Sequence, residues 1–311
     1  YSSFGGDSFA VAAQLDGTID VVQVASTEYA FAALCADGSV VFWGDSSYGG
    51  EMPPQVAVQL IGAPAVHVFS SERAFAALRA DGSVVTWGDW WYGGDSSAVA
   101  AQLDGTNDVV RVFSTSQAFA ALRADGSLVT WGAWWSGGDS SAVAVQLDGT
   151  NDVVQVFSTE LAFAALRADG SVVTWGYSSF GGDSFAVAAQ LDGTNDVVQV
   201  FSTAHAFAAL RADGSVVTWG DQQYGGNSSA VAAQLDGTND VVQVFSTWGA
   251  FAALRVDGSV VTWGDSWNGG DSSAVAAQLD GTKDVVRVAS TDRAFAALRA
   301  DGSVVTWGDQ Q

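Results

Sequence analysis

The sequence predicts an all-β protein, a closed β-propeller with seven blades. Three observations predict it. A 44-residue unit occurs seven times in tandem, every unit contains three short strand patterns, and the last three residues begin an eighth unit that stops at once. A period of about 40–50 residues with several short strands is typical of propellers, whose blades bury their faces against one another.

The repeat covers the whole chain. Its first copy reads YSSFGGDSFAVAAQLDGTIDVVQVASTEYAFAALCADGSVVFWG. The seven units span residues 1–44, 45–88, 89–132, 133–176, 177–220, 221–264 and 265–308. Because the chain ends within three residues of the unit position where it began, a ring is favoured over a solenoid, whose ends normally carry atypical capping repeats. We therefore expect one domain over residues 1–311 and a monomeric ring.

The third unit illustrates the three strands of a blade. Residues 109–113 (VVRVF), 118–123 (AFAALR) and 128–131 (LVTW) are apolar and rich in residues that favour strands. The Asp-Gly-Ser segment at 125–127 predicts a hairpin between the second and third strands. Residues 114–117 form a second tight turn, and a glycine-rich connector after the third strand leads to the next blade.

Composition excludes several classes of partner. The chain is 48% hydrophobic with a mean hydropathy of +0.20, enough for a core, but no apolar run reaches the roughly 18 residues that span a bilayer. The net charge is −23, so the surface should repel nucleic acid and anionic membranes. We therefore expect no nucleic-acid partner and no membrane insertion. Cys35 is the only cysteine, which excludes an intrachain disulfide.

Differences between the units are concentrated in two short windows. The first window follows the Trp-Gly pair and covers residues 45–48, 89–92, 133–136, 177–180, 221–224 and 265–268. The second follows the Ser-Thr or Ser-Ser pair and covers residues 28–29, 72–73, 116–117, 160–161, 204–205, 248–249 and 292–293. The alternating strand directions place both windows at the same end of every blade. We call this end the top face; a fixed frame with one varied loop face is typical of a recognition surface.

The windows are rich in tryptophan. Seven of the 13 tryptophans belong to the repeated Trp-Gly frame, and the other six all lie in the windows. Trp, Tyr and Arg dominate interface hot spots, at ~2 kcal/mol or more each when truncated. The candidate partner-binding residues are Trp90, Trp91, Tyr92, Trp134, Trp135, Trp248, Trp267, Tyr29, Arg73, His205, Gln222, Gln223 and Arg293. The alternative is that loop tips tolerate change and that some of these tryptophans fold back over the ring.

No motif for catalysis, metal binding or a cofactor is present. The two histidines, His67 and His205, have no repeated partner, so neither a metal cluster nor a catalytic triad is indicated. The sequence contains no Gly-x-Ser-x-Gly motif and no phosphate-binding loop. The Asp-rich turns lack the ligand spacing of an EF-hand. We expect no enzyme activity, no cofactor and no metal.

The repeat resembles the RCC1-like family. The pattern Ala-Leu-x-x-Asp-Gly-x-Val-x-x-Trp-Gly occurs at residues 77–88, and Pro-Pro-Gln-Val at residues 53–56 resembles the connector of that family. The units are compact, similar to secreted bacterial members of the β-lactamase inhibitory protein type. The resemblance implies a seven-bladed propeller used mainly for protein binding through loop faces. Because no basic face exists, a chromatin role is not carried over.

The function predicted from the sequence is a non-catalytic, protein-binding scaffold that recognises a partner through the aromatic loops of its top face. Two alternatives stay open. One is a carbohydrate-binding module, because sugars stack on exposed aromatic rings, although the windows differ from unit to unit. The other is a propeller domain of a larger regulatory or scaffold protein, which the start at Tyr1 without a methionine permits.

Overall fold

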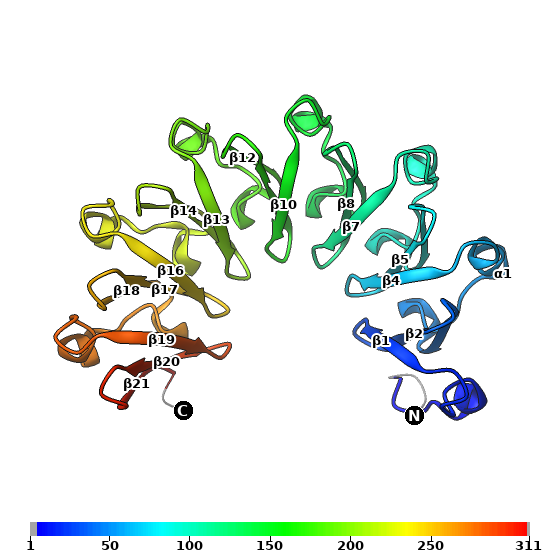
Figure 1. Cartoon of the computed structure of the whole chain (residues 1–311), viewed down its shortest axis with the longest axis horizontal. Helices are drawn as coiled ribbons and strands as arrows, with labels where there is room; N and C mark the ends of the chain where they lie inside the picture. Colours follow the sequence, from blue (N-terminus) through cyan, green and yellow to red (C-terminus); the bar gives the residue numbers. More distant parts are fainter. Residues whose placement is uncertain (1–4, 310–311) are drawn as a thin grey trace. The chain divides into compact units, whose positions relative to one another are not determined.

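The computed structural model describes residues 5–309 and is all-β (Figure 1). It contains seven three-stranded antiparallel sheets, one for each repeat. This matches the seven blades that the sequence predicts. By its internal contacts the chain divides into two compact units, Tyr1–Val153 and Val154–Gln311. Within residues 5–309, no helix is long and apolar enough to cross a membrane.

The strands follow the repeat without interruption. The first three sheets are formed by β1 (Val21–Ser26), β2 (Ala30–Cys35), β3 (Val40–Gly44), β4 (Ala65–Ser70), β5 (Ala74–Arg79), β6 (Val84–Gly88), β7 (Val109–Ser114), β8 (Ala118–Arg123) and β9 (Leu128–Gly132). The other four are formed by β10 (Val153–Ser158), β11 (Ala162–Arg167), β12 (Val172–Gly176), β13 (Val197–Ser202), β14 (Ala206–Arg211), β15 (Val216–Gly220), β16 (Val241–Ser246), β17 (Ala250–Arg255), β18 (Val260–Gly264), β19 (Val285–Ser290), β20 (Ala294–Arg299) and β21 (Val304–Gly308).

Short helical turns occupy the connectors. Those that carry the first window are η3 (Ser46–Tyr48), η5 (Trp90–Tyr92), η7 (Trp134–Ser136), η9 (Ser178–Phe180), η11 (Gln222–Gly226) and η13 (Ser266–Asn268). Those that precede the next first strand are η2 (Phe9–Gln14), η4 (Val58–Leu60), η6 (Ser97–Gln102), η8 (Ser141–Gln146), η10 (Phe185–Gln190), η12 (Ser229–Gln234) and η14 (Ser273–Gln278). The helix α1 (Pro54–Ala57) occurs in the connector between β3 and β4, where Pro53 precedes it.

Each sheet is a meander whose register is set by its hairpin turn. In the third sheet the turn is closed by Asp125, whose carboxylate accepts the backbone N–H of Ser127 (3.0 Å), and Gly126 adopts φ 76°. This confirms the hairpin predicted from Asp-Gly-Ser. The resulting register places Phe119 opposite Trp131, and the two rings stack at 5.3 Å. Burying such aromatic pairs stabilises the blade by about 0.5–1.5 kcal/mol beyond the area they cover.

Neighbouring sheets of one compact unit pack face to face. In Tyr1–Val153, Ala74, Ala76, Leu78 and Val84 of the second sheet share one buried cluster with residues of the third, including Val109, Val112, Phe119 and Trp131. In Val154–Gln311 the corresponding positions of consecutive sheets form equivalent clusters, and β13, β16 and β19 lie next to one another (Figure 1). The alanines of the second strand explain the close approach, because they leave room for the rings of the next blade.

The top ends of neighbouring sheets are joined through their backbones. The N–H of Glu28 donates to the carbonyl of Glu72 (2.9 Å), and the N–H of Glu72 donates to the carbonyl of Ser116 (3.0 Å). The same bonds run from Glu160 to Ala204 to Trp248 to Asp292 in the second compact unit. These first residues of the second windows therefore fix the spacing of the top loops, whatever their side chains are.

The first and last sheets each leave an apolar face uncovered. Val21 and Val24 of β1 are 41% and 58% exposed, whereas Val109 and Val112 at the same positions of β7 are 3% and 2% exposed. In the last sheet, Leu298 and Val304 are 38% and 60% exposed, whereas Leu254 and Val260 one blade earlier are each 8% exposed. Closure of the ring and a single domain over 1–311 stay predictions.

Candidate partner-binding face

The two varied windows are held together by a side-chain hydrogen bond at one end of the first six blades. Ser71 Oγ donates to the carbonyl of Tyr92 (2.8 Å), and Thr115 Oγ1 donates to the carbonyl of Ser136 (3.0 Å). The equivalent bonds from Thr27, Thr159, Thr203 and Thr247 reach Tyr48, Phe180, Tyr224 and Asn268. The Ser or Thr that precedes each second window is therefore constant because it binds the end of the first window. The common face predicted from strand directions is confirmed.

The first window is also fixed by the next blade. After Tyr92 the chain turns at Gly93, which adopts φ 92° and whose carbonyl accepts the indole N–H of Trp131 (3.0 Å). A Cβ on Gly93 would lie 2.5 Å from Phe119 Cδ2, so only glycine fits against that ring. At the other end of the turn, the Asp89 carboxylate accepts the N–H of Trp91 (2.9 Å). Framework residues thus hold the varied side chains on a rigid turn.

Four of the predicted residues form a continuous row of indoles, which we call the tryptophan strip. It consists of Trp90 and Trp91 on η5 and Trp134 and Trp135 on η7. The ring centroids are 4.1 Å apart for Trp90–Trp91, 5.6 Å for Trp91–Trp135 and 5.5 Å for Trp134–Trp135. Trp135 is anchored because its Nε1 donates to Gln117 Oε1 (2.8 Å). The strip crosses from one blade to the next.

The strip is exposed. Trp90, Trp91 and Trp134 present 61%, 44% and 67% of their surface to solvent. Exposed indoles in mutual contact are unusual on a surface that binds nothing, because aromatic surface is favoured at interfaces and in cores. The strip is therefore the strongest candidate for a binding surface on the first compact unit.

A second set of varied side chains packs between the blades rather than outward. We call it the interblade ladder: the last residue of a second window lies between the fourth residues of two first windows. The Arg73 guanidinium lies over the rings of Tyr48 (4.7 Å) and Tyr92 (4.6 Å), and Tyr29 contacts Tyr48 edge-on at 4.5 Å. At Gly249 the space is closed, since a Cβ there would lie 2.7 Å from Tyr224 Cδ1.

His205 occupies the same ladder position in the second compact unit. Its ring lies 4.5 Å from Phe180, 4.6 Å from Tyr224 and 4.6 Å from Trp248. Burial lowers the pKa of His205, and the carboxylates of Glu160 and Asp221 oppose that shift only in part. Its Nδ1 is buried without a hydrogen bond, and its Nε2 is 3.9 Å from Glu160 Oε2. The imidazole is therefore mostly neutral at neutral pH and acts as a packed ring.

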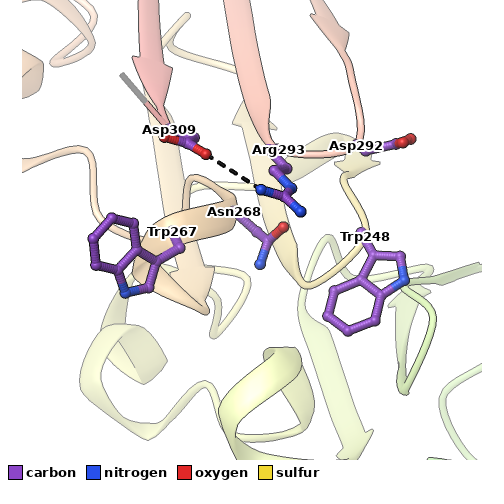
Figure 2. Close-up of a pocket in the computed structure, with 6 residues that line it drawn as sticks. All are labelled: Trp248, Trp267, Asn268, Asp292, Arg293 and Asp309. Carbon is purple, nitrogen blue, oxygen red and sulfur yellow. Dashed lines mark ion pairs between the residues drawn. The ribbon is translucent and has the colours of Figure 1, made fainter. Parts of the chain in front are cut away.

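A pocket of about 530 Å³ lies at the top of the last two blades (Figure 2). Figure 2 shows Trp248 and Trp267 on either side of Asn268 and Arg293. Arg293 Nη1 pairs with Asp309 Oδ2 at 3.6 Å, while the Asp292 carboxylate points away. The pocket thus combines two indole walls with amide, guanidinium and carboxylate groups.

The structure sorts the predicted residues into three groups. Trp90, Trp91, Trp134 and Trp135 form the strip; Tyr29, Arg73, Tyr92 and His205 belong to the ladder; Trp248, Trp267 and Arg293 line the pocket. Gln222 and Gln223 are exposed on η11, where the Asp221 carboxylate accepts the backbone N–H of Gln223 (2.8 Å). Partner binding by these residues stays a prediction.

Several members of these groups were not predicted from the sequence: Tyr48, Gln117, Phe180, Tyr224 and Asn268. One signal could have found most of them. The fourth position of the first window is aromatic in Tyr48, Tyr92, Phe180 and Tyr224, which indicates a packing role rather than free variation.

Groups that could hold a metal were not found in the part of the chain that the structure describes: no three His, Cys, Asp or Glu residues converge there. The turn aspartates instead accept local hydrogen bonds. Asp104 Oδ1, for example, accepts the N–H (2.9 Å) and the hydroxyl (2.7 Å) of Thr106.

No protein-family model matches the chain, and no curated protein matches its sequence. Solved structures with a similar fold include the ectodomain of the Physcomitrella patens receptor kinase CR4, which is 15% identical with a TM-score of 0.47 over 94% of this chain and 73% of that chain. Prp20p from Saccharomyces cerevisiae is 16% identical with a TM-score of 0.45 over 79% of this chain and 72% of that chain. The CRINKLY WD40 ectodomain of the Arabidopsis thaliana receptor kinase ACR4 is 14% identical with a TM-score of 0.44 over 90% of each chain. At such identities and TM-scores these structures assign no function and no family to the chain.

Proposed function

We propose that the chain is a closed seven-bladed, RCC1-like propeller that binds a protein partner, without catalysis, through the tryptophan strip on its top face. The observation that carries the proposal is the strip itself. Four indoles touch one another on two turns that the framework holds rigidly, and three of them are largely exposed. Rigid, preorganised aromatic side chains lose little conformational entropy on binding, so they are efficient anchors for a partner.

Closure of the ring is supported by the two uncovered sheet faces. Inside each compact unit, the face that carries Val109 and Val112 is covered by the sheet before it, and the face that carries Leu254 and Val260 by the sheet after it. The first sheet lacks a preceding neighbour at Val21 and Val24, and the last lacks a following neighbour at Leu298 and Val304. These faces carry the same residue types as the covered pairs, so they would complement each other as a seventh interface.

The proposal is tested by capture with the full chain. Immobilised wild-type protein should retain a specific partner from its native source, identified by mass spectrometry. The variant Trp90→Ala/Trp91→Ala/Trp134→Ala/Trp135→Ala should lose it, by about a hundredfold or more in affinity, because several hot-spot side chains are removed together. Circular dichroism should show an unchanged β spectrum, since the removed side chains lie outside the blade core.

The matched control is Trp248→Ala/Trp267→Ala, which removes two exposed indoles from the second compact unit. It should retain the partner. If the strip variant folds and still retains the partner at wild-type affinity, the strip is not the binding site and the proposal is wrong.

Carbohydrate binding is a second candidate, favoured by the pocket of Figure 2, in which two indoles flank Asn268 and Arg293. Sugars stack on such rings and bond to such polar groups. A glycan array distinguishes the two candidates with the same proteins. Specific glycan binding that is lost in Trp248→Ala/Trp267→Ala and retained in the strip variant would replace the protein-binding proposal.

A further inference from the structure

On the top face of the first compact unit, two tyrosine rings hold the cationic side chain of Arg73. The Arg73 guanidinium is sandwiched between the rings of Tyr48 and Tyr92, with its Cζ 4.7 Å and 4.6 Å from the two centroids. Its Nε makes no hydrogen bond and lies 3.9 Å from Glu28 Oε2. The rings therefore provide most of the direct contact, as expected of a cation–π sandwich.

The tryptophan strip lies next to this sandwich, and the cation–π contacts found among residues 5–309 involve Tyr48, Tyr92 and Phe113 rather than its indoles. The first compact unit contains four cationic side chains, Arg73, Arg79, Arg111 and Arg123, all of them placed elsewhere. Arg79 and Arg123 donate Nε to Ser83 and Ser127 at the hairpin turns of the opposite face. The Arg111 guanidinium lies over Phe113 of its own strand.

The electrostatics of the face favour a basic partner. A carboxylate lies at the strip itself, because Asp89 caps η5 and accepts the N–H of Trp91 (2.9 Å). The chain as a whole carries 34 acidic and 11 basic side chains. Such a field attracts a basic segment at long range, and indole is the best aromatic acceptor for a guanidinium at short range.

We propose that the occupant of the tryptophan strip is an extended, arginine-presenting segment of a protein partner, whose guanidinium groups lie over the indoles of Trp90, Trp91, Trp134 and Trp135. This inference rests on the proposed function, because it names the chemistry of the partner at the same strip. Arginine is preferred over lysine there, since its planar guanidinium stacks on aromatic faces and is more weakly hydrated than an ammonium group.

The test uses the full chain and three short fluorescent peptides of one length, in which arginine, lysine or glutamate alternates with serine. Fluorescence anisotropy at roughly 50 and 300 mM salt separates screened charge attraction from close contact. We expect the arginine peptide to bind about tenfold tighter than the lysine peptide, with the difference persisting at high salt, and the glutamate peptide not to bind.

Variants assign the binding to the strip. Trp91→Ala/Trp135→Ala should weaken the arginine peptide about tenfold or more, and Trp91→Phe/Trp135→Phe should weaken it less, because phenylalanine keeps a ring with weaker attraction for cations. The control Phe185→Ala removes an exposed aromatic ring that belongs to none of the strip, the ladder and the pocket, and it should leave the affinity unchanged.

Equal affinity for the arginine and lysine peptides, or equal loss in Trp91→Ala/Trp135→Ala and in Phe185→Ala, would overturn the inference and leave only non-specific charge attraction. That result is distinguishable from failure of the proposed function. If the fourfold alanine variant of the strip loses the captured partner but binds the arginine peptide like wild type, the strip binds a partner of other chemistry. If it keeps the partner, the proposed function itself fails.

Discussion

Arg73 shows how a varied position can serve the fold. Its side chain joins two blades through Tyr48 and Tyr92. Arg73→Ala should lower the free energy of unfolding by about 1–2 kcal/mol, because two cation–π contacts are lost. Arg73→Met, which keeps an apolar stem between the rings, should lose less. Urea denaturation followed by fluorescence measures both changes.

Arg293 is the control for this prediction. It occupies the same unit position as Arg73 but is exposed and has no ring over its guanidinium among the described residues. Arg293→Ala should change the free energy of unfolding by less than about 0.5 kcal/mol, as surface substitutions usually do. Equal losses for Arg73→Ala and Arg293→Ala would show that the sandwich contributes nothing.

At the residue scale the sequence predicts the strip better than the ladder. The indoles of the strip are neighbours in sequence on each turn, and strand direction alone places the two turns on the same face. The ladder pairs residues of different blades, such as His205 with Phe180, so it depends on the spacing between sheets. That spacing results from side-chain packing and from the backbone bonds of the top loops, which no local pattern reveals.

Among the elements, the strands and hairpins are predicted well and the connectors are not. Asp-Gly-Ser fixes each hairpin because its chemistry is local. The short helical turn Ser97–Gln102 was expected only as a connector, and the bulge between Val109 and Arg111 was not expected. The helical turn leads to Leu103, which is buried against the neighbouring blade and whose carbonyl accepts the N–H of Val84 (2.9 Å). The cause of this turn is tertiary, so strand periodicity does not show it.

The Leu-Asp-Gly-Thr turns make a prediction about pH at the scale of the element. Hydrogen bonds from the backbone and hydroxyl of Thr106 lower the pKa of Asp104 below 3.8, and matching bonds lower the pKa of Asp16, Asp148, Asp192, Asp236 and Asp280. Because the folded state holds these groups ionised, their stabilisation is present above the unfolded pKa near 3.8. It is lost as the pH falls through the lower folded values.

Thermal unfolding between about pH 2 and pH 6 measures this loss of stability in acid. Wild type should lose stability below about pH 4, whereas Asp104→Asn/Asp148→Asn should lose less on acidification, because an amide accepts the same bonds without titrating. An identical loss of stability with falling pH in wild type and variant would show that these turns do not link stability to pH. The second 44-residue repeat offers a further control, because Ile61 occupies the position that Asp104 has in the third repeat and cannot titrate.

At the scale of the whole molecule, the number of blades follows from the repeat but the closing interface does not. Packing of consecutive blades inside one compact unit follows from chain order, whereas a closing interface would join residues that are far apart in sequence. Within residues 5–309, all seven sheets take their strands from consecutive segments, so no described strand from one end of the chain joins the sheet at the other end. Closure would therefore depend on side-chain packing alone, and substitutions can test it.

Val24 decides between an open and a closed molecule. It is 58% exposed on β1, and its neighbour Val22 is 61% exposed on the same strand, so an aspartate at either position should be equally harmless if the first sheet has no neighbour. If blade seven covers blade one, Val24→Asp buries a charge as Val112→Asp would, at a cost of about 2–3 kcal/mol or more, while Val22→Asp stays near neutral. Val304→Asp on β21 should behave like Val24→Asp, because it would lie on the opposing face of the same interface.

Urea denaturation of the four variants measures the costs. If the ring is closed, sedimentation velocity should give Val24→Asp and Val304→Asp a lower sedimentation coefficient than wild type. Equal stability of Val24→Asp and Val22→Asp would contradict the closed ring, because a sheet packed against a neighbour cannot accept the charge that an uncovered sheet accepts.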